Sequence, residues 1–262
     1  MARPIPPQVI PRPQSWQPGG PPPWAAVPEA GRRRISLQSV LSALDAKGQR
    51  GPVPDHIGSD RVLGPSIVAS ELTAPIATSV NSAVLAPFFE EDGESKLIFT
   101  RRSTALRNHR GEVSFPGGRI DQGELAVEAA LREAYEEVAL NPGLVTIAGW
   151  IHPVLTLGSG SLIMPVLATL PSRPRLVPSP SEVERVFDVS LADLAEPDVF
   201  HEERWSIPGR VIAGSPDNSF AVWFFEVEGE MIWGATARMV HEILSIVLAP
   251  TAAAAPPDLA PG

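Results

Sequence analysis

The order of apolar and polar residues along the middle of the chain predicts a domain that mixes strands and helices. Alternating or dense apolar runs predict strands over residues 82–89, 96–101, 112–115, 145–155, 162–170 and 219–227. Apolar residues at helical spacing predict helices over 35–44, 123–138 and 235–248, with a short helix over 190–194. Because these elements interleave without regular βαβ units, we expect an α/β (α+β) fold with a mixed β-sheet sandwiched between helices.

Proline-rich segments flank this central part. The first 28 residues contain ten prolines, and the residues after Ala249 are rich in alanine and proline. Proline removes a backbone donor and hinders helices, so we predict disordered tails over 1–34 and 250–262. Residues 35–79 are predicted to hold one helix and a connector, and residues 80–249 the main domain.

Composition narrows the functional classes. A formal net charge of −9 argues against general binding to nucleic acid or to an anionic membrane. The chain has no cysteine, which excludes disulfides, thiolate catalysis and cysteine zinc sites. No apolar run reaches the roughly 18–20 residues that span a bilayer. We therefore expect a cytoplasmic protein with a small-molecule substrate, and the sequence leaves open whether it forms a homodimer.

Three carboxylates crowd one face of the helix predicted over 123–138. Glu133, Glu136 and Glu137 occupy positions i, i+3 and i+4, which places their Cβ atoms roughly 5–6 Å apart. Like charges at this spacing destabilise a helix unless a cation lies among them, and hard divalent ions take oxygen ligands. The pattern predicts a Mg²⁺ or Mn²⁺ site, although a solvated acidic face would show the same three residues.

A glycine turn precedes these carboxylates at a fixed distance. The segment 118–140 resembles the Nudix box over 23 residues, through Gly118, Glu124, Arg132-Glu133, Glu136-Glu137 and Leu140. The resemblance implies a metal-dependent hydrolase of nucleoside diphosphates linked to another moiety, with the three glutamates holding the metal. It also implies that Arg132 orients a glutamate and that Glu124 supports the junction of loop and helix.

The match departs from the family pattern at one position. Where the family has glycine, this chain has Ala139. A glycine there takes a left-handed backbone conformation that alanine resists by about 1 kcal/mol. We therefore expect Asn141, which tolerates that conformation, to end the helix.

A second segment, immediately upstream, carries several cations in an otherwise acidic chain. Residues 98–118 resemble the coenzyme A pyrophosphatase branch of the Nudix superfamily, through Thr100, Arg102, Ser103, Arg107, Gly111 and Phe115-Pro116-Gly117-Gly118. The resemblance implies coenzyme A as substrate, and we assign its binding to Arg102, Ser103, Arg107, Gly117 and Gly118. Guanidinium groups also suit phosphates on chemical grounds, which would apply to the cluster of Arg101, Arg102, Arg107, His109 and Arg110. Each arginine alone would equally suit a surface ion pair.

The chemistry expected of such a site is metal-assisted hydrolysis of a pyrophosphate bond, giving 3′,5′-ADP and 4′-phosphopantetheine from coenzyme A. Glu133 and Glu137 are the predicted strongest metal ligands, with Glu136 beside them. The general base is left open between one of these glutamates and Glu182 of the loop 180–184, where a solvated charge is an equal interpretation. His152 lies in an apolar predicted strand and is predicted to be a hydrogen-bonded core residue.

Two other functions remain compatible with the sequence. One is a Nudix hydrolase with another substrate, such as ADP-ribose, a dinucleotide or a nucleotide, because the box is common to all of these. The other is a Nudix-fold binding protein without catalysis. The three intact glutamates argue against it, because such proteins often lose those charges.

Overall fold

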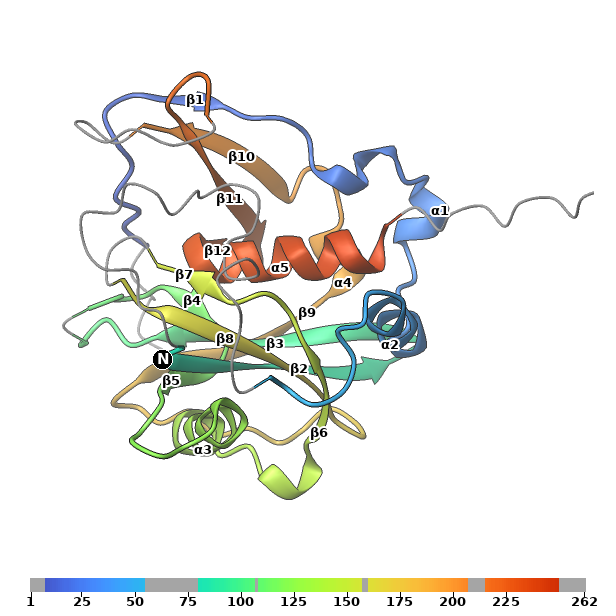
Figure 1. Ribbon diagram of the computed structural model, residues 1–262, viewed down its shortest axis with the longest axis vertical. Coiled ribbons are helices and arrows are strands. Elements are labelled where there is room, and N and C mark those ends of the chain that lie inside the picture. The colour runs from blue at the N-terminus through green and yellow to red at the C-terminus, as the bar shows by residue number, and fades with distance from the viewer. Residues whose placement is uncertain (1–7, 55–79, 107, 157–159, 207–214, 250–262) are drawn as a thin grey trace, which may run out of the picture.

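Two β-sheets with helices around and between them form the part of the chain that the structure describes (Figure 1). This computed structural model describes residues 8–54, 80–106, 108–156, 160–206 and 215–249. Its helices are α1 (Glu29–Arg32), α2 (Leu37–Ala46), α3 (Ala126–Val138), α4 (Leu191–Leu194) and α5 (Gly234–Val247), with 3-10 turns η1 (Pro23–Ala26) and η4 (Pro142–Leu144). In the described ranges, no helix is long and apolar enough to cross a membrane.

The larger sheet is mixed, as the sequence predicts. Its main strand order is β4 (Val113–Ser114), β3 (Glu94–Arg102), β2 (Ser82–Glu91), β8 (Leu162–Thr169) and β6 (Thr146–Trp150). Three further strands join this path, namely β5 (Gly117–Arg119) on β2, β7 (Val154–Leu155) on β8 and β9 (Val183–Ser190) on β3. β2 and β8 run parallel, and the other pairs are antiparallel.

Both faces of this sheet are covered by helices, which explains the dense apolar runs in β2 and β3. Ala83 and Leu85 pack with the apolar side of α3, whereas Ala86 and Phe88 pack in the core shared with α2 and α5. Successive side chains of a strand point to opposite faces, so a strand buried on both faces needs apolar residues at nearly every position. The predicted helix-sheet-helix sandwich is confirmed.

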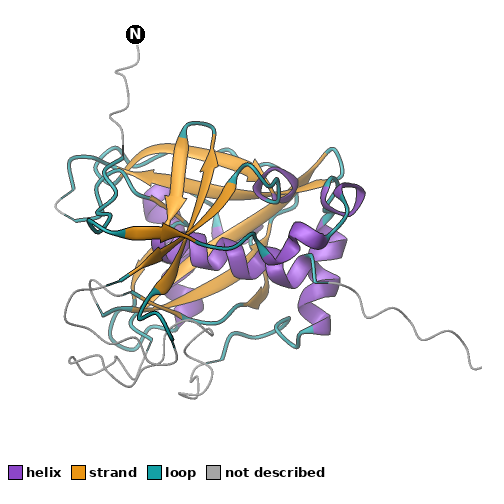
Figure 2. Cartoon of the chain, turned by 90° about the horizontal axis from the view of Figure 1, so that it is seen from above, coloured by secondary structure: helices purple, strands orange, loops and turns teal. Residues whose placement is uncertain are grey.

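The smaller sheet was largely missed by the sequence prediction. Its order is β1 (Trp16–Pro18), β10 (Phe200–Trp205), β11 (Phe220–Val227) and β12 (Glu230–Trp233), and only β11 was expected. α5 packs against β11 and β12 on one side and against β7 of the larger sheet on the other. In Figure 2, which looks onto the molecule from the side of β1 and β10, α5 lies behind the strands of this sheet.

The N-terminal segment corrects the prediction of a disordered tail over 1–34, which is wrong for residues 8–34. β1 pairs with β10 as an edge strand, and the Trp24 side chain is 1% exposed in the main core. Trp24 Nε1 and Arg32 Nη1 both donate to the carbonyl of Ala195, at 3.1 and 2.9 Å. Prolines prevent a long helix here, but they do not prevent an extended segment from packing through a few anchors. The tail predicted over 250–262, residues 1–7 and the connector over 55–79 lie outside the described residues.

The C-terminal end of α3 also differs from expectation. Ala139 itself takes the left-handed conformation, with φ 56° and ψ 31°, and Leu140 N donates to Ala134 O at 3.3 Å. Asn141 has φ −65° and instead caps η4, so the expectation that it ends α3 is wrong. The cause is tertiary, because this tight turn places the Leu140 side chain in the core, where it is 2% exposed.

Candidate active site

Two glutamates of α3 face the short strand β5. Glu137 is 2% exposed, and its Oε2 accepts from Gly117 N at 3.2 Å, while Arg102 Nη1 lies 3.4 Å from its Oε1. The Glu133 carboxylate lies against Gly118, and a methyl group at that position would overlap it. A larger residue at 118 would therefore force the Glu133 carboxylate to move, because that carboxylate fills the space that a Cβ atom would take.

Burial makes the charged form of Glu137 unfavourable, because its polar neighbours only partly replace the water that it loses. Removal from water raises the pKa of Glu137 from 4.5 to about 7, more than Arg102 and the Gly117 N–H lower it. The neighbouring charges of Glu133 and Glu182 raise the pKa of Glu137 further. The pKa of Glu133 is raised too, mainly by burial and against the effect of Arg132. Both carboxylates therefore lie where an added cation would be strongly favourable.

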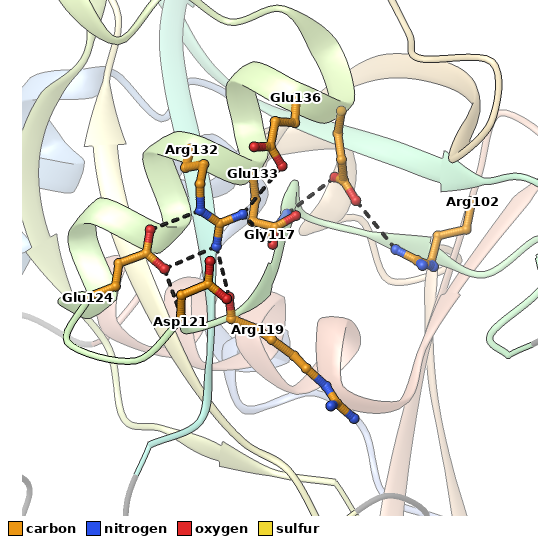
Figure 3. A network of polar contacts seen from close by, with 9 residues as sticks. Arg102, Gly117, Arg119, Asp121, Glu124, Arg132, Glu133 and Glu136 are labelled. Carbon is orange, nitrogen blue, oxygen red and sulfur yellow. Dashed lines mark hydrogen bonds and ion pairs between the residues drawn. The ribbon is translucent and has the colours of Figure 1, made fainter.

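Arg132 holds the acidic face of α3 in place, as Figure 3 shows. Its Nε and Nη2 donate to the two oxygens of Glu124 at 2.9 and 3.0 Å, and Nη2 also donates to Arg119 O at 2.9 Å. Its Nη1 donates to Glu133 at 2.9 Å and to Glu136 at 3.3 Å. The hydrogen bonds to Glu124 and then to Glu133 raise the pKa of Arg132. The predicted orienting role of Arg132 matches these contacts, whereas Glu136 is 54% exposed and only loosely held.

Backbone groups of the turn before α3 complete the arrangement, and the sequence analysis did not include them. Asp121 N donates to Glu124 Oε2 at 2.9 Å, and this bond, after that of Arg132, lowers the pKa of Glu124. Glu124 therefore joins the turn to the helix, as predicted. Figure 3 shows the Arg119 side chain pointing away from the carboxylates, so Arg119 takes part through its carbonyl alone. Side-chain patterns give no signal for such backbone contacts.

The donor set fits a hard divalent ion. In the described ranges, no group of three histidine, aspartate or glutamate side chains is already arranged to hold a metal ion. The oxygens of Glu133 and Glu137 instead accept from Arg132 and Arg102. Carboxylate oxygens are the ligands that Mg²⁺ and Mn²⁺ prefer, and the raised pKa values show that these two carboxylates lack sufficient positive charge.

Three members of the predicted cationic cluster, Arg101, Arg102 and His109, lie apart from one another in the described part of the chain. Arg102 reaches α3, but the preceding Arg101 points to the opposite face of β3, where its Nη1 pairs with Glu230 Oε2 at 2.5 Å. His109 is exposed and contacts Glu112 at 2.9 Å. Arg107 lies outside the described residues. Of the predicted cluster, Arg102 is the member that the structure places beside the carboxylates, and its buried Nε has no hydrogen-bond partner within the described part.

Ser103 and Glu182 are joined through the backbone. Ser103 N donates to Glu182 O at 2.7 Å, and the Ser103 hydroxyl, which is buried, accepts from Ala105 N at 3.3 Å. Ser103 thus stabilises its own loop. Glu182 is exposed and close enough to affect the pKa values of Glu133 and Glu137. Glu184, the other acid of the segment 180–184, lies on β9 and faces Arg101 at 3.8 Å.

His152, for which the sequence also makes a prediction, contacts a glutamate of α5. Its Nδ1 lies 2.5 Å from Glu242 Oε1 on α5, and the same oxygen accepts from His152 N at 3.1 Å. These contacts agree with the predicted hydrogen bonding, but the His152 side chain is 44% exposed, so the predicted core position is wrong.

Comparison with known proteins shows the family of this chain. The NUDIX domain model matches residues 80–210, and the chain belongs to the Nudix family. A Nudix hydrolase named NudL from Photorhabdus laumondii is 34% identical over 164 residues, which cover 62% of this chain and 82% of the relative. Nudix hydrolase 3 of Caenorhabditis elegans is 31% identical over 199 residues, which cover 70% of this chain and 80% of the relative.

A solved structure is also similar. The Nudix hydrolase RenU of M. smegmatis aligns with a TM-score of 0.37 at 22% identity, over 42% of this chain and 70% of that chain. The family assignment rests on the domain match and the sequence relatives, and it identifies the protein as a Nudix hydrolase that acts on a nucleoside diphosphate derivative.

Proposed function

We propose that this protein hydrolyses the pyrophosphate bond of coenzyme A or acyl-coenzyme A, releasing 3′,5′-ADP and 4′-phosphopantetheine or its acyl form. The observation that carries the proposal is the contact between Arg102 and Glu137. Arg102 belongs to the segment that resembles coenzyme A pyrophosphatases, and Glu137 belongs to the Nudix box. Their contact supports a single site in which a substrate-binding cation and a metal-binding carboxylate act on the same phosphates.

The metal would be held by Glu133 and Glu137, with Glu136 alongside. Nudix hydrolases generally use divalent ions such as Mg²⁺ or Mn²⁺. Such an ion, when bound, neutralises phosphate charge and lowers the pKa of a coordinated water. Arg132 would keep Glu133 turned toward β5, because it already holds that carboxylate from the solvent side of the helix turn. Gly118 leaves room for the Glu133 carboxylate next to the backbone, and Gly117 allows the close approach of Ala83 and Val84 of β2.

The remaining chemistry belongs to the side chains around the phosphates. A water attacks one phosphorus, the bridging P–O bond breaks, and the leaving phosphate carries the electron pair away. Arg102 would donate to the phosphate oxygens, since a charged guanidinium matches their geometry. The water's proton would go to a box glutamate or to Glu182, which lies near both buried carboxylates.

A product assay tests this function. The purified protein is incubated with coenzyme A, dephospho-coenzyme A, ADP-ribose and nucleoside triphosphates, each with Mg²⁺, with Mn²⁺ and with EDTA. We expect ion-dependent release of 3′,5′-ADP from coenzyme A, at a higher kcat/KM than for any other substrate. Cleavage of ADP-ribose with no reaction of coenzyme A would reject the proposal and make the protein a Nudix hydrolase for another diphosphate.

Two glutamate variants test the residue assignments. Glu133→Gln and Glu137→Gln should each lower kcat by about a thousandfold, because each removes a charged ligand of the ion. The matched control is Glu128→Gln on the same helix, where the glutamine oxygen can still accept from Leu125 N as Glu128 does. A folded Glu137→Gln protein with near wild-type turnover would show that this carboxylate has no catalytic part.

A further inference from the structure

A carboxylate from the smaller sheet is buried beside the active-site strand of the larger one. Glu230 of β12 is 3% exposed, and Arg101 of β3 is also 3% exposed. Arg101 Nη1 lies 2.5 Å from Glu230 Oε2, and Arg185 Nη1 of β9 lies 3.2 Å from Glu230 Oε1. One carboxylate therefore uses both oxygens to hold arginines from two neighbouring strands.

This arrangement neutralises a pair of like charges within the larger sheet. Arg101 and Arg185 are directly opposite each other in the antiparallel pair of β3 and β9. Like charges at opposed positions destabilise a strand pair, and here Arg101 is also buried. Glu230 neutralises the pair from the next sheet, and Glu228 and Glu184 add outer contacts at 2.7 and 3.8 Å. Buried ion pairs seldom add net stability relative to apolar packing, so a positional role is the better explanation of their presence.

The contacts of Glu230 with Arg101 and Arg185, here called the clamp, lie next to Arg102, the residue that the proposed function needs. The register between β3 and β9 shifts between Arg101 and Arg102, so that Arg101 faces Arg185 and Arg102 faces Val183. A bulge of this kind re-aims the side chains on either side of it. Because adjacent residues of a strand point to opposite faces, fixing Arg101 on the α5 side fixes Arg102 on the α3 side, where it meets Glu137.

We propose that Glu230 is a positioning residue of the active site, which clamps Arg101 and Arg185 and thereby sets the direction of Arg102. It touches neither substrate nor metal. The inference rests on the proposed function only in giving Arg102 a part in turnover, and it holds for whichever nucleoside diphosphate derivative the wild-type protein cleaves.

The first experiment compares Glu230→Gln with Glu228→Gln. Both substitutions remove one negative charge near Arg185, but Glu228 is 49% exposed whereas Glu230 is buried between Arg101 and Arg185. With the best substrate of the wild type, kcat/KM of Glu230→Gln should fall about ten- to a hundredfold, since small displacements of a binding group have effects of this size. Glu228→Gln should stay within about twofold of wild type, as expected for a surface ion pair. Equal values for Glu230→Gln and wild type would overturn the proposal.

The second experiment separates positioning from general stability. Glu230→Gln is repeated in an Arg102→Gln background, with Tm measured for every variant. If Glu230 acts through Arg102, its effect on kcat/KM should nearly vanish there, while its effect on Tm persists. If Glu230→Gln instead lowers kcat/KM by the same factor in the Arg102→Gln background as in wild type, Glu230 only supports the fold.

A third variant covers the case in which Glu230→Gln does not fold. Arg101→Gln combined with Glu230→Gln removes both partners of the buried pair, which is milder than removing one. This double variant should fold and still show the ten- to hundredfold loss in kcat/KM, because the buried ion pair then no longer fixes the side chain next to Arg102. Wild-type kcat/KM in a folded double variant would reject the clamp. A wild type that cleaves ADP-ribose but not coenzyme A would instead reject the proposed substrate and leave this comparison valid.

Discussion

Replacing the buried Glu137 by glutamine should stabilise the metal-free protein above neutral pH. Glu137 is 2% exposed, and its contacts with Arg102 and Gly117 N do not offset the loss of water. Glutamine has nearly the same shape and carries no charge, so it keeps the packing and removes the cost of burying an anion. A substitution that is expected to lower kcat should therefore raise stability when no metal is present.

The size and sign of this effect follow from the pKa. Burial raises the pKa of Glu137 from 4.5 to about 7, so the folded protein holds this proton more tightly than the unfolded chain does. The stability that the proton on Glu137 gives the folded protein is fully present below the unfolded pKa of 4.5, and it is lost as pH rises through about 7. Between pH 5 and pH 8, the free energy of unfolding of wild type should fall by about 2–3 kcal/mol relative to that of the glutamine variant.

The assay is chemical or thermal unfolding of both proteins in EDTA at pH 5 and pH 8. The quantity of interest is the change in the difference between variant and wild type, because other titrating groups cancel in it. For a chain of this size, about 2–3 kcal/mol corresponds to a relative shift in Tm of about 5–10 °C. Glu136→Gln is the matched control, since its carboxylate is 54% exposed and should give no comparable pH-dependent difference.

Adding Mg²⁺ or Mn²⁺ should make wild type more stable than Glu137→Gln. An ion that binds the folded state stabilises it by mass action, and wild type should gain stability that Glu137→Gln does not. The reasoning is refuted if the difference between variant and wild type is the same at pH 5 and pH 8 in EDTA. Such a result would mean that the Glu137 carboxylate is well compensated without any metal.

Three further predictions concern the backbone and the packing. Ala139→Gly should raise the free energy of unfolding by about 1 kcal/mol because φ is 56° there, whereas Ala43→Gly within α2 should lower it by a similar amount in the same denaturant titration. Trp24→Ala should cost about 3–5 kcal/mol, and Trp16→Ala, at a side chain that is 46% exposed, should cost far less by the same measurement. Gly118→Ala should lower turnover and Mg²⁺ affinity about tenfold or more, because the new methyl group displaces the adjacent carboxylate; unchanged kinetics would contradict this.

The elements of the larger sheet were predictable where the local pattern and the tertiary environment agree. β2, β3 and β8 are buried on both faces, so dense apolar runs mark them, and α3 and α5 each show one apolar side. β9 was not predicted as a strand, because its charged residues Glu184, Arg185 and Asp188 break the apolar run. Those charges are accommodated by partners from other strands, such as Glu230, which a local window along the sequence does not contain.

The candidate site was predictable in its acidic half and less so in its basic half. The spacing of Glu133, Glu136 and Glu137 along a helix determines that they share a face, whatever the rest of the fold does. For Arg101 and Arg102, alternation along a strand requires opposite faces, but the sequence does not reveal which face α3 covers. That choice is made by the packing of Leu97 and Phe99 on one side and Ile98 on the other.

The N-terminal segment shows where a compositional argument fails. Ten prolines in 28 residues exclude a long helix, yet they suit an edge strand, which needs backbone donors on one side only. β1 ends at Pro18 and pairs with β10, while the Gln8 side chain bonds to both the N–H and the carbonyl of Met231 on β12. The segment therefore provides hydrogen bonds at both ends of the smaller sheet, where strand edges would otherwise be left unpaired. Composition averaged over the segment hides this, because the contacts depend on a few anchors and on the sheet that they meet.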